Sequence, residues 1–131
     1  MIKEKTYSDK LKSPLWQQKR LKIMERDKFT CMLCTDKESS LHVHHKQYTG
    51  EPWEAPDEDL ETLCCHCHRA ETEMEKNGDT LIFAMKTGTN YFGKTKKGLI
   101  IIGKIMPDDS LIISLVVNKP KEFLSILNTL I

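Results

Sequence analysis

The sequence predicts an α+β fold. Its 131 residues contain two C-x-x-C pairs, with 29 residues between the second cysteine of the first pair and the first cysteine of the second. Every histidine and cysteine of the chain falls within the window of about 38 residues that contains both pairs. On both sides of the window, segments with helical periodicity and short segments with strand character occur. These three observations indicate one small α+β domain whose chemistry lies at the cysteines and histidines.

The composition is that of a soluble globular protein, with 39% hydrophobic and 30% charged residues. Residues 1–5 include three charged side chains, so we expect no secretory signal. No run approaches the roughly 18 apolar residues that a membrane span needs. Five cysteines, of which two are adjacent, make a poor disulfide framework. Paired C-x-x-C units are better explained as zinc ligands in a reducing compartment, and we therefore expect a cytoplasmic protein.

The net charge of +1 conceals an uneven distribution of charge along the chain. Residues 1–30 carry nine Lys or Arg and four Asp or Glu, residues 31–75 carry three and eleven, and residues 76–131 carry eight and four. One explanation is an ordinary solvated surface. The other is an acidic, metal-attracting centre between basic flanks that meet a phosphate backbone. Charge by itself does not decide between them.

Four cysteines give the strongest signal: Cys31, Cys34, Cys64 and Cys67. Two such pairs place four thiolates within reach of one tetrahedral ion, and a closed four-sulfur shell leaves no position for a substrate. We therefore predict a structural Zn²⁺, on which the folding of so small a core depends. Cys65, inside the second pair, is expected to be a bystander or to compete with Cys64 for the metal.

A Ser-Pro pair opens a predicted helix over residues 14–26, in which Trp16, Ile23 and Met24 share the buried face. The basic side of this helix, which carries Lys19, Arg20 and Lys22, is expected to be solvated or to contact phosphate.

Residues 29–34 are predicted to form a short strand and a zinc knuckle. Strand character predicts a second strand at residues 41–45, followed by a loop with Gly and Pro over residues 46–59. Residues 60–64 return to the cysteines, and a helix is predicted from Cys67 to about Lys76.

Residues 79–131 are predicted to be an extension of a module at residues 7–78. Residues 79–85 fit a short helix and a strand equally well. Two apolar runs flank the turn at residues 107–110 and predict a β-hairpin, and the apolar spacing from Pro120 onward predicts an amphipathic helix. The extension is expected to cover the back of the core or to form the face of a homodimer.

Three histidines, His44, His45 and His68, lie where a second metal site can form, and Glu71 follows His68 on the same predicted helix face. An ion with few protein ligands keeps the open positions that phosphodiester hydrolysis requires. Two adjacent histidines can divide the work, one as metal ligand and one as a base with a pKa of about 6.5. The alternative is a set of spare histidines on a zinc-binding module. Neighbours on a regular strand face opposite ways, so the adjacent pair shares one site only if the strand ends or twists there.

A longer set of motifs extends from about Tyr7 to Glu75 and carries a family resemblance. The motifs are Leu11-Lys12-Ser13-Pro14-Leu15-Trp16, Arg26-Asp27, Cys31-Met32-Leu33-Cys34, Leu41-His42-Val43-His44-His45, Tyr48, Pro52-Trp53-Glu54, Pro56-Asp57-Glu58 and Leu60-Glu61-Thr62-Leu63-Cys64-Cys65-His66-Cys67-His68. Together they resemble the HNH nuclease family, in a bacterial or phage subgroup with a Pro-Trp-Glu loop. The resemblance covers just over half of the chain. It implies the ββα-metal fold, a treble-clef-like module with a structural zinc and an N-terminal helix.

The resemblance also implies roles by position. His44 matches the ligand of a catalytic metal, His45 matches the general base that activates water, and His68 matches the closing metal ligand. The four cysteines match the structural zinc of many family members.

Two positions depart from the family pattern. The asparagine that holds the loop of the base through backbone hydrogen bonds falls at Asp59, and an aspartate can accept such bonds but cannot donate them. Some members place a histidine one turn after His68, where this chain has Thr72. Glu71 is the expected substitute, as an oxygen ligand suited to Mg²⁺ or Mn²⁺.

The resemblance implies a metal-dependent endonuclease that hydrolyses DNA phosphodiester bonds by a one-metal mechanism. Its catalytic ion is expected to be Mg²⁺, Mn²⁺ or Ni²⁺, and the basic flanks are expected to contact the DNA backbone. The alternative is a catalytically decayed zinc-dependent DNA-binding module, in which Asp59 and Thr72 mark the lost activity. A protein-interaction role rests on the apolar tail alone. Tyr48 and Trp53 either pack the loop onto the module or stack on an unpaired base.

Overall fold

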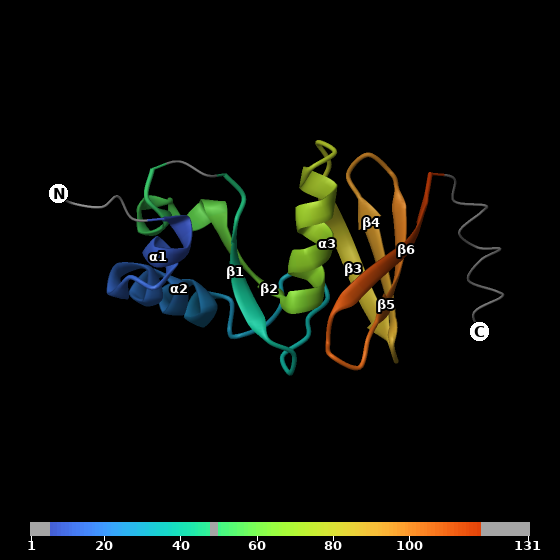
Figure 1. Ribbon diagram of the computed structural model, residues 1–131, viewed down its shortest axis with the longest axis horizontal. Coiled ribbons are helices and arrows are strands. Elements are labelled where there is room, and N and C mark those ends of the chain that lie inside the picture. The colour runs from blue at the N-terminus through green and yellow to red at the C-terminus, as the bar shows by residue number, and fades with distance from the viewer. Residues whose placement is uncertain (1–5, 48–49, 119–131) are drawn as a thin grey trace.

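The computed structural model describes residues 6–47 and 50–118. Their elements form a mixed α+β structure with two antiparallel sheets, one of two strands and one of four. Figure 1 shows the order of the layers: two N-terminal helices lie against the two-stranded sheet, and helix α3 lies between that sheet and the four-stranded one. Within the described ranges, every helix is too short or too polar to span a bilayer.

Two helices open the described chain, α1 (Tyr7–Leu11) and α2 (Pro14–Arg26). The bounds of α2 confirm the helix predicted over these residues, and the Ser13 side chain caps it as expected. Its buried side chains are the three predicted for that face. Helix α1 was not predicted, although Thr6 and Asp9 form a capping box, which signals a helix start.

Of the short strand and zinc knuckle predicted at residues 29–34, the strand is wrong. Lys28, Phe29 and Thr35 have positive φ angles of 58°, 51° and 66°, in the left-handed region that strands do not enter. The backbone folds into turns instead, and the N–H of Thr35 donates to the carbonyl of Cys31 over 3.0 Å. Residues three apart in a strand would face opposite sides, whereas this turn brings Cys31 and Cys34 together.

The two-stranded sheet is an antiparallel pair of β1 (Leu41–His45) and β2 (Leu60–Cys64), and helix α3 (Cys65–Glu75) follows β2 directly. The strand predicted at residues 41–45 is confirmed, and α3 begins two residues before the predicted start. Because neighbouring strand residues point to opposite faces, His45 lies toward α2 and His44 toward α3.

The loop between β1 and β2 contains two short 3₁₀ helices, η1 (Pro52–Glu54) and η2 (Asp57–Asp59). The N–H of Lys46 donates to the carbonyl of Asp59 over 2.8 Å and closes the loop at its base. The Trp53 side chain packs against the cluster beneath α2, in agreement with the packing alternative for this residue.

A four-stranded antiparallel sheet follows α3, in the order β3-β4-β5-β6. Its strands are β3 (Leu81–Thr87), β4 (Asn90–Thr95), β5 (Ile100–Ile105) and β6 (Leu111–Val117). The predicted hairpin is confirmed as β5 and β6, but the extension is a whole sheet rather than a hairpin alone. Residues 79–85 contribute to β3, and β4 was not predicted. The helix predicted from Pro120 falls in residues 119–131, outside the described residues.

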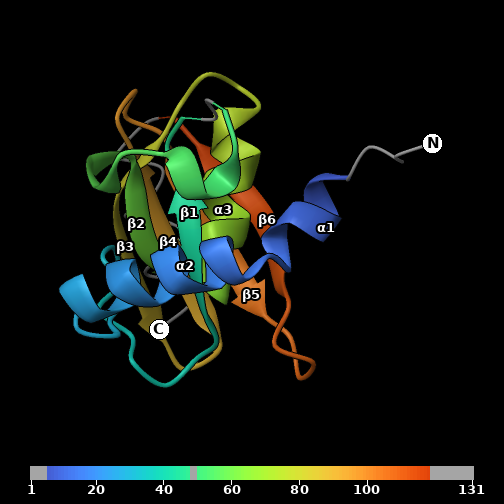
Figure 2. The same ribbon diagram turned by 90° about the vertical axis from the view of Figure 1, so that its left-hand side faces the viewer.

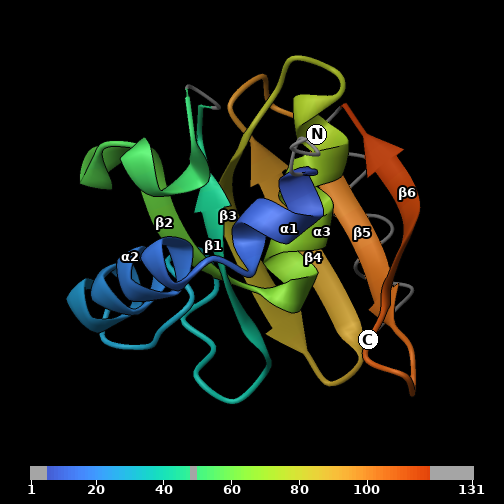
Figure 3. The ribbon, with the colours of Figure 1, turned by 60° about the vertical axis from the view of Figure 1, so that its left-hand side comes forward.

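Two hydrophobic clusters hold the layers together. The first lies between α2 and the two-stranded sheet (Figure 2) and consists of Trp16, Ile23, Met24, Val43, Ala55 and Leu60. The second lies between α3 and the four-stranded sheet (Figure 3) and consists of Cys31, Leu63, Cys64, Cys67, Ala70, Met74, Leu81, Ala84, Tyr91, Ile101 and Leu111. Three cysteines of the predicted zinc site therefore share one core with side chains from every strand of the larger sheet.

Candidate metal centres

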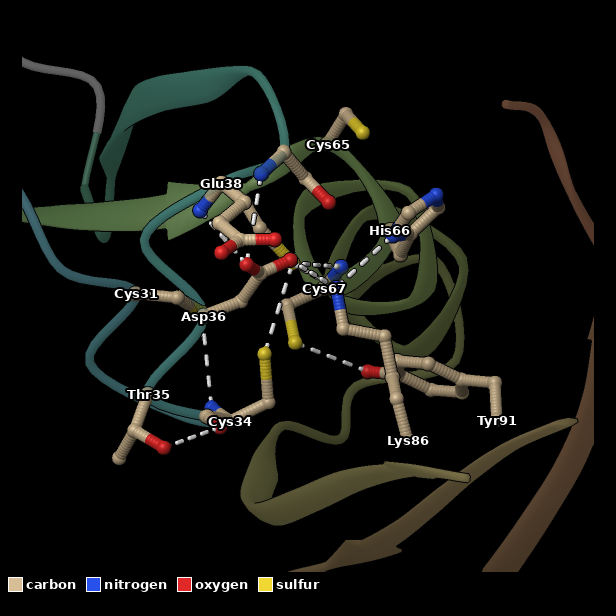
Figure 4. Close-up of polar contacts among 12 residues, drawn as sticks. Cys31, Cys34, Thr35, Asp36, Glu38, Cys65, His66, Cys67, Lys86 and Tyr91 are labelled. Atoms are coloured by element: carbon tan, nitrogen blue, oxygen red, sulfur yellow. Dashed lines mark hydrogen bonds and ion pairs between the residues drawn. The ribbon is translucent and has the colours of Figure 1, made fainter. Parts of the chain in front are cut away.

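Four cysteine side chains, Cys31, Cys34, Cys64 and Cys67, converge where β2 passes into α3 (Figure 4). Their Sγ atoms all lie within 4.8 Å of one another, and those of Cys34 and Cys64 are 3.6 Å apart. A tetrahedral ion with metal–sulfur bonds of about 2.3 Å separates its sulfurs by about 3.8 Å. The four side chains predicted as zinc ligands are thus brought together, at separations compatible with a structural Zn²⁺.

The local backbone supports thiolates at this place. The N–H of Cys34 donates to Cys31 Sγ over 3.5 Å, and the N–H of Cys67 donates to Cys64 Sγ over 3.4 Å. Three of the four side chains are fully buried, and Cys34 is half-buried. Cys65 points outside the four-sulfur group. A closed and buried sulfur site fits a structural ion rather than a catalytic one.

Two side chains of the four-stranded sheet donate to these sulfurs. The Tyr91 hydroxyl donates to Cys67 Sγ over 3.2 Å, and Lys86 Nζ donates to Cys64 Sγ over 3.3 Å while also pairing with Asp36. Burial by itself would lower the pKa of Lys86, but the Asp36 carboxylate and the sulfurs raise it above its usual range. Lys86 is therefore a cation beside thiolates whose summed charge exceeds that of one Zn²⁺. Nothing in the sequence marked either donor.

A second group of potential ligand atoms, from Cys65, His66 and Asp109, lies beside the first. His66 Nε2 is 3.0 Å from Asp109 Oδ1, and His66 Nδ1 is 3.0 Å from Lys86 Nζ. Because an ammonium group only donates, Nδ1 accepts and the ring proton is on Nε2. Both ring nitrogens are thus engaged, and His66 links β3 to the β5–β6 turn by hydrogen bonds.

His44 lines a polar cavity of about 800 Å³ between β1, the end of α3 and the start of β3. The side chain is 2% exposed, and its Nε2 lies 2.6 Å from Glu75 Oε1. Its Nδ1 is buried and has no hydrogen-bond partner among the described residues. The His44 ring is 5.2 Å from the ring of His68, whose Nδ1 lies 2.8 Å from Nδ1 of His42.

His68 is held in its neutral form. Burial is the largest cause, and the nearby rings of His44 and His42 add to it, so that the pKa of His68 falls to about 4. A neutral imidazole keeps the lone pair with which histidine binds metal ions.

Glu71 and Glu75, one turn apart on α3, have different surroundings. The Glu71 carboxylate is 2% exposed and accepts from Thr80 Oγ1 over 3.0 Å and from the N–H of Leu81 over 3.3 Å. Burial raises the pKa of Glu71, the Thr80 and Leu81 hydrogen bonds oppose this rise, and the charge of Glu75 adds to it. Glu71 is thus engaged with the start of β3, whereas Glu75 contacts His44.

The three residues expected to hold a catalytic ion, His44, His68 and Glu71, form no group whose ligand atoms all lie within 4.8 Å in the described part of the chain. Sequence reasoning missed Glu75. The signal that could have found it is its position seven residues after His68, on the same face of the helix.

His45 lies in a separate groove on the other face of β1. Its ring stacks on Trp16 with centroids 4.9 Å apart, and its Nε2 lies 3.1 Å from the carbonyl oxygen of Pro52. A carbonyl only accepts, so Nε2 carries the proton and Nδ1 the lone pair. Asp59 supports the same loop through its backbone carbonyl, and its carboxylate makes no hydrogen bond within residues 6–47 and 50–118.

The basic side of α2 holds the loop between β1 and β2. Lys19 and Lys22 both pair with Asp57. Arg26 donates to the carbonyls of Asp57 and Leu60, over 2.7 Å in each case. Lys19 and Lys22, which were expected to be solvated or to contact phosphate, are therefore engaged within the protein, as is Arg26.

The described residues thus contain a buried four-cysteine cluster and, at a separate cavity, the His44–Glu75 pair with His68 beside it. Comparisons of the chain with protein-family models, with curated proteins and with solved structures find no match.

Proposed function

We propose that this protein is a metal-dependent endonuclease of the HNH type that hydrolyses phosphodiester bonds in DNA. The contact between His44 and Glu75 carries the proposal, because an imidazole and a carboxylate from different elements meet at 2.6 Å in a polar cavity. The order of a β-hairpin followed at once by a helix, with the cysteines at their junction, supports it, since the ββα-metal motif has the same order.

His44, His68 and Glu75 are the proposed ligands of the catalytic ion, with Glu75 in the place first expected for Glu71. His44 Nε2 and Glu75 Oε1 already lie 2.6 Å apart, and the ring of His68 lies beside that of His44. Like the set with Glu71, the three side chains form no group whose ligand atoms all lie within 4.8 Å among the described residues, so binding of the ion has to draw His68 towards the other two. Few protein ligands of mixed nitrogen and oxygen type suit Mg²⁺ or Mn²⁺, and Ni²⁺ also accepts imidazole. The bound ion would stabilise the charge on the pentacoordinate phosphorus and the leaving 3′ oxygen.

His45 is the proposed general base. Its hydrogen bond to the Pro52 carbonyl keeps the lone pair on Nδ1, and the stacking on Trp16 holds the ring plane. The base and the ligand pair lie on opposite faces of β1, and His68 connects them, because it lines the groove of His45 and its ring lies next to that of His44. We therefore place the reacting phosphate beside His68, where His45 can take the proton from the attacking water.

The second candidate is a zinc-dependent DNA-binding module without catalysis. The hydrogen bonds of Glu71 to Thr80 and Leu81 favour this second candidate, because they leave the ligand set expected from the family resemblance unassembled. The Asp59 carboxylate also makes no contact that orients the loop of His45 within the described residues. In this candidate, the four-cysteine frame and the loop persist and the histidines are structural.

A plasmid-cleavage assay on the zinc-loaded protein, with Mg²⁺, Mn²⁺ or Ni²⁺ added, separates the two candidates. Wild type should nick or cut the plasmid, and His45→Ala and Glu75→Gln should each lower the rate by roughly 100-fold or more. Glu73→Gln is the matched control, since Glu73 lies on the same helix, pairs only with Arg69 and Lys76 among the described residues, and should keep the wild-type rate.

A zinc-loaded wild type that binds DNA and cuts it with none of the three ions establishes the DNA-binding module in place of the nuclease. Equal cutting by His45→Ala keeps the enzyme and removes His45 as its base. Equal cutting by Glu75→Gln removes the proposed carboxylate ligand.

A further inference from the structure

We propose that Arg20 binds a backbone phosphate and thereby positions a DNA strand beside His45. The identity of the ligand as DNA rests on the proposed function, whereas the anion-binding chemistry of the groove rests on the residues that line it. No role for Arg20 follows from the metal centres described above.

The groove has a volume of about 340 Å³ and is lined by residues of α1, α2, β1 and α3. Figure 2 shows α2 in front of β1. Its apolar wall is formed by Tyr7, Leu11, Trp16, Leu41 and Val43. His42, His45 and His68 line the same groove, and Arg20 is its single Lys or Arg side chain among the described residues. A volume above about 300 Å³ is in the range of small-ligand sites, so a nucleotide unit can enter.

Arg20 differs from the other cations of α2 in what it contacts. Lys19 and Lys22 both pair with Asp57, and Arg26 donates to the carbonyls of Asp57 and Leu60, so these three contact the loop between β1 and β2.

The Arg20 guanidinium instead donates through Nε to Gln17 Oε1 over 3.2 Å and through Nη1 to Met24 Sδ over 3.6 Å, and both partners are neutral. Within the part of the chain that the structure describes, no carboxylate pairs with Arg20. A guanidinium has five N–H donors, so several remain for an anion that enters the groove.

The chemistry of the groove selects a phosphodiester. A guanidinium presents a planar fork of donors that matches two oxygens of a tetrahedral phosphate, and its charge is permanent. The half-exposed ring of Tyr7 and the apolar wall provide a surface for the base or sugar next to a bound phosphate. A phosphate on Arg20 therefore places the adjoining linkage of the strand in the groove that contains His45.

The test is equilibrium binding of a short fluorescent single-stranded DNA oligonucleotide to the zinc-loaded full chain, without added divalent ion so that no cleavage occurs. Arg20→Gln should weaken binding by roughly tenfold or more and reduce the salt dependence of log K by about one unit. The affinity of Arg20→Lys should lie between those of wild type and Arg20→Gln, because lysine keeps the positive charge and loses the planar set of guanidinium donors. Lys12→Gln removes the same charge from an exposed residue outside the groove, and it should change the affinity less than about twofold.

A second readout uses inorganic phosphate and the ring signals of the histidines by NMR. Phosphate should shift the signals of the groove histidines in wild type and Lys12→Gln, and it should leave them unchanged in Arg20→Gln. Zinc content and thermal unfolding of each variant verify the fold, and Arg20→Lys supplies the comparison if Arg20→Gln does not fold.

The inference is overturned if Arg20→Gln and Lys12→Gln bind the oligonucleotide alike, or if wild type binds neither probe. Its failure is distinct from that of the proposed function. If wild type cuts DNA and Arg20→Gln keeps the wild-type KM, only the role of Arg20 is lost. If wild type never cuts DNA and the Arg20-dependent binding remains, only the nuclease is lost.

Discussion

Lys86 Nζ lies 3.3 Å from Cys64 Sγ. Lys86 belongs to β3, whereas Cys64 ends β2, so the four-stranded sheet supplies a positive charge to the cysteine cluster of the preceding segment. The same ammonium group pairs with Asp36 in the turn that follows the first cysteine pair. The sheet therefore acts on the cluster electrostatically as well as through the core that the two share.

Replacing Lys86 with Met should lower the affinity for zinc by roughly tenfold, because outer contacts of this kind tune metal ligands by that order. The substitution removes the charge that offsets the thiolates and leaves Asp36 without its cation. Competition with a zinc chelator measures the change. Lys104→Met is the control, since Lys104 is exposed on β5 and contacts Asn90. Equal zinc affinity in the two variants would show that the Lys86 charge does not act on the cluster.

Replacing Cys31 with Ser should remove the zinc and unfold the protein. Zinc binding to four thiolates contributes as much free energy as the about 5–15 kcal/mol that separates folded from unfolded domains. Cys65→Ser should keep one zinc per chain and the wild-type unfolding transition, because Cys65 lies outside the four-sulfur group. Zinc content after dialysis and circular dichroism on heating provide the measurement. Loss of zinc from Cys65→Ser would place Cys65 in the ligand set.

Replacing Arg26 with Met should lower the free energy of unfolding by about 2 kcal/mol, since two carbonyls lose charged donors and the buried Asp27 loses its cation. Arg69→Met removes an exposed partner of Glu73 on α3 and should cost less than about 0.5 kcal/mol. Urea unfolding of the zinc-loaded variants compares the two. Similar losses would mean that Arg26 does not clamp the loop.

The stability of the Glu71→Gln variant relative to wild type should rise with pH. Burial raises the pKa of Glu71 in the folded protein above its ordinary value of 4.5. At pH values between the pKa of the unfolded chain and that of the folded protein, the folded protein therefore holds more protons than the unfolded chain. The free energy of unfolding of wild type therefore falls as pH rises through that window. The variant lacks this ionisation, and its advantage in urea unfolding should grow as the pH rises above about 4.5.

Glu73→Gln is the control for this pH dependence, because the hydrogen bond from Lys76 lowers the pKa of Glu73 rather than raises it. It should show no gain with pH. A constant or falling relative stability of Glu71→Gln would contradict the assignment of Glu71 as a buried, raised-pKa carboxylate.

The elements that were predicted correctly can be recognised from residues that are adjacent in the sequence. Helix α2 has its Ser13 cap, and β1 is a short run without Gly, Pro, Asp or Asn, the residues that are depleted in strands. Strand β4 was missed because Gly93 weakens its strand signal, yet a Cβ at this position would lie 3.0 Å from Leu81 Cδ2. The glycine makes room for a side chain of the adjacent strand, and that requirement is visible only after the strands pair.

The candidate site divides in the same way. The sequence by itself determined which four cysteines are the candidate zinc ligands, because C-x-x-C spacing is a local property that places two sulfurs together in any tight turn. Only the tertiary structure decided that Glu75 rather than Glu71 contacts His44. It also decided that His44 and His45 lie on opposite faces of β1. The two donors to the sulfurs, Lys86 and Tyr91, come from the four-stranded sheet and were likewise visible only in the fold. Two carboxylates one turn apart on a helix have equivalent local signals. Which of them meets a histidine on a distant strand depends on how α3 packs between the two sheets, and that packing depends on residues far apart in the chain.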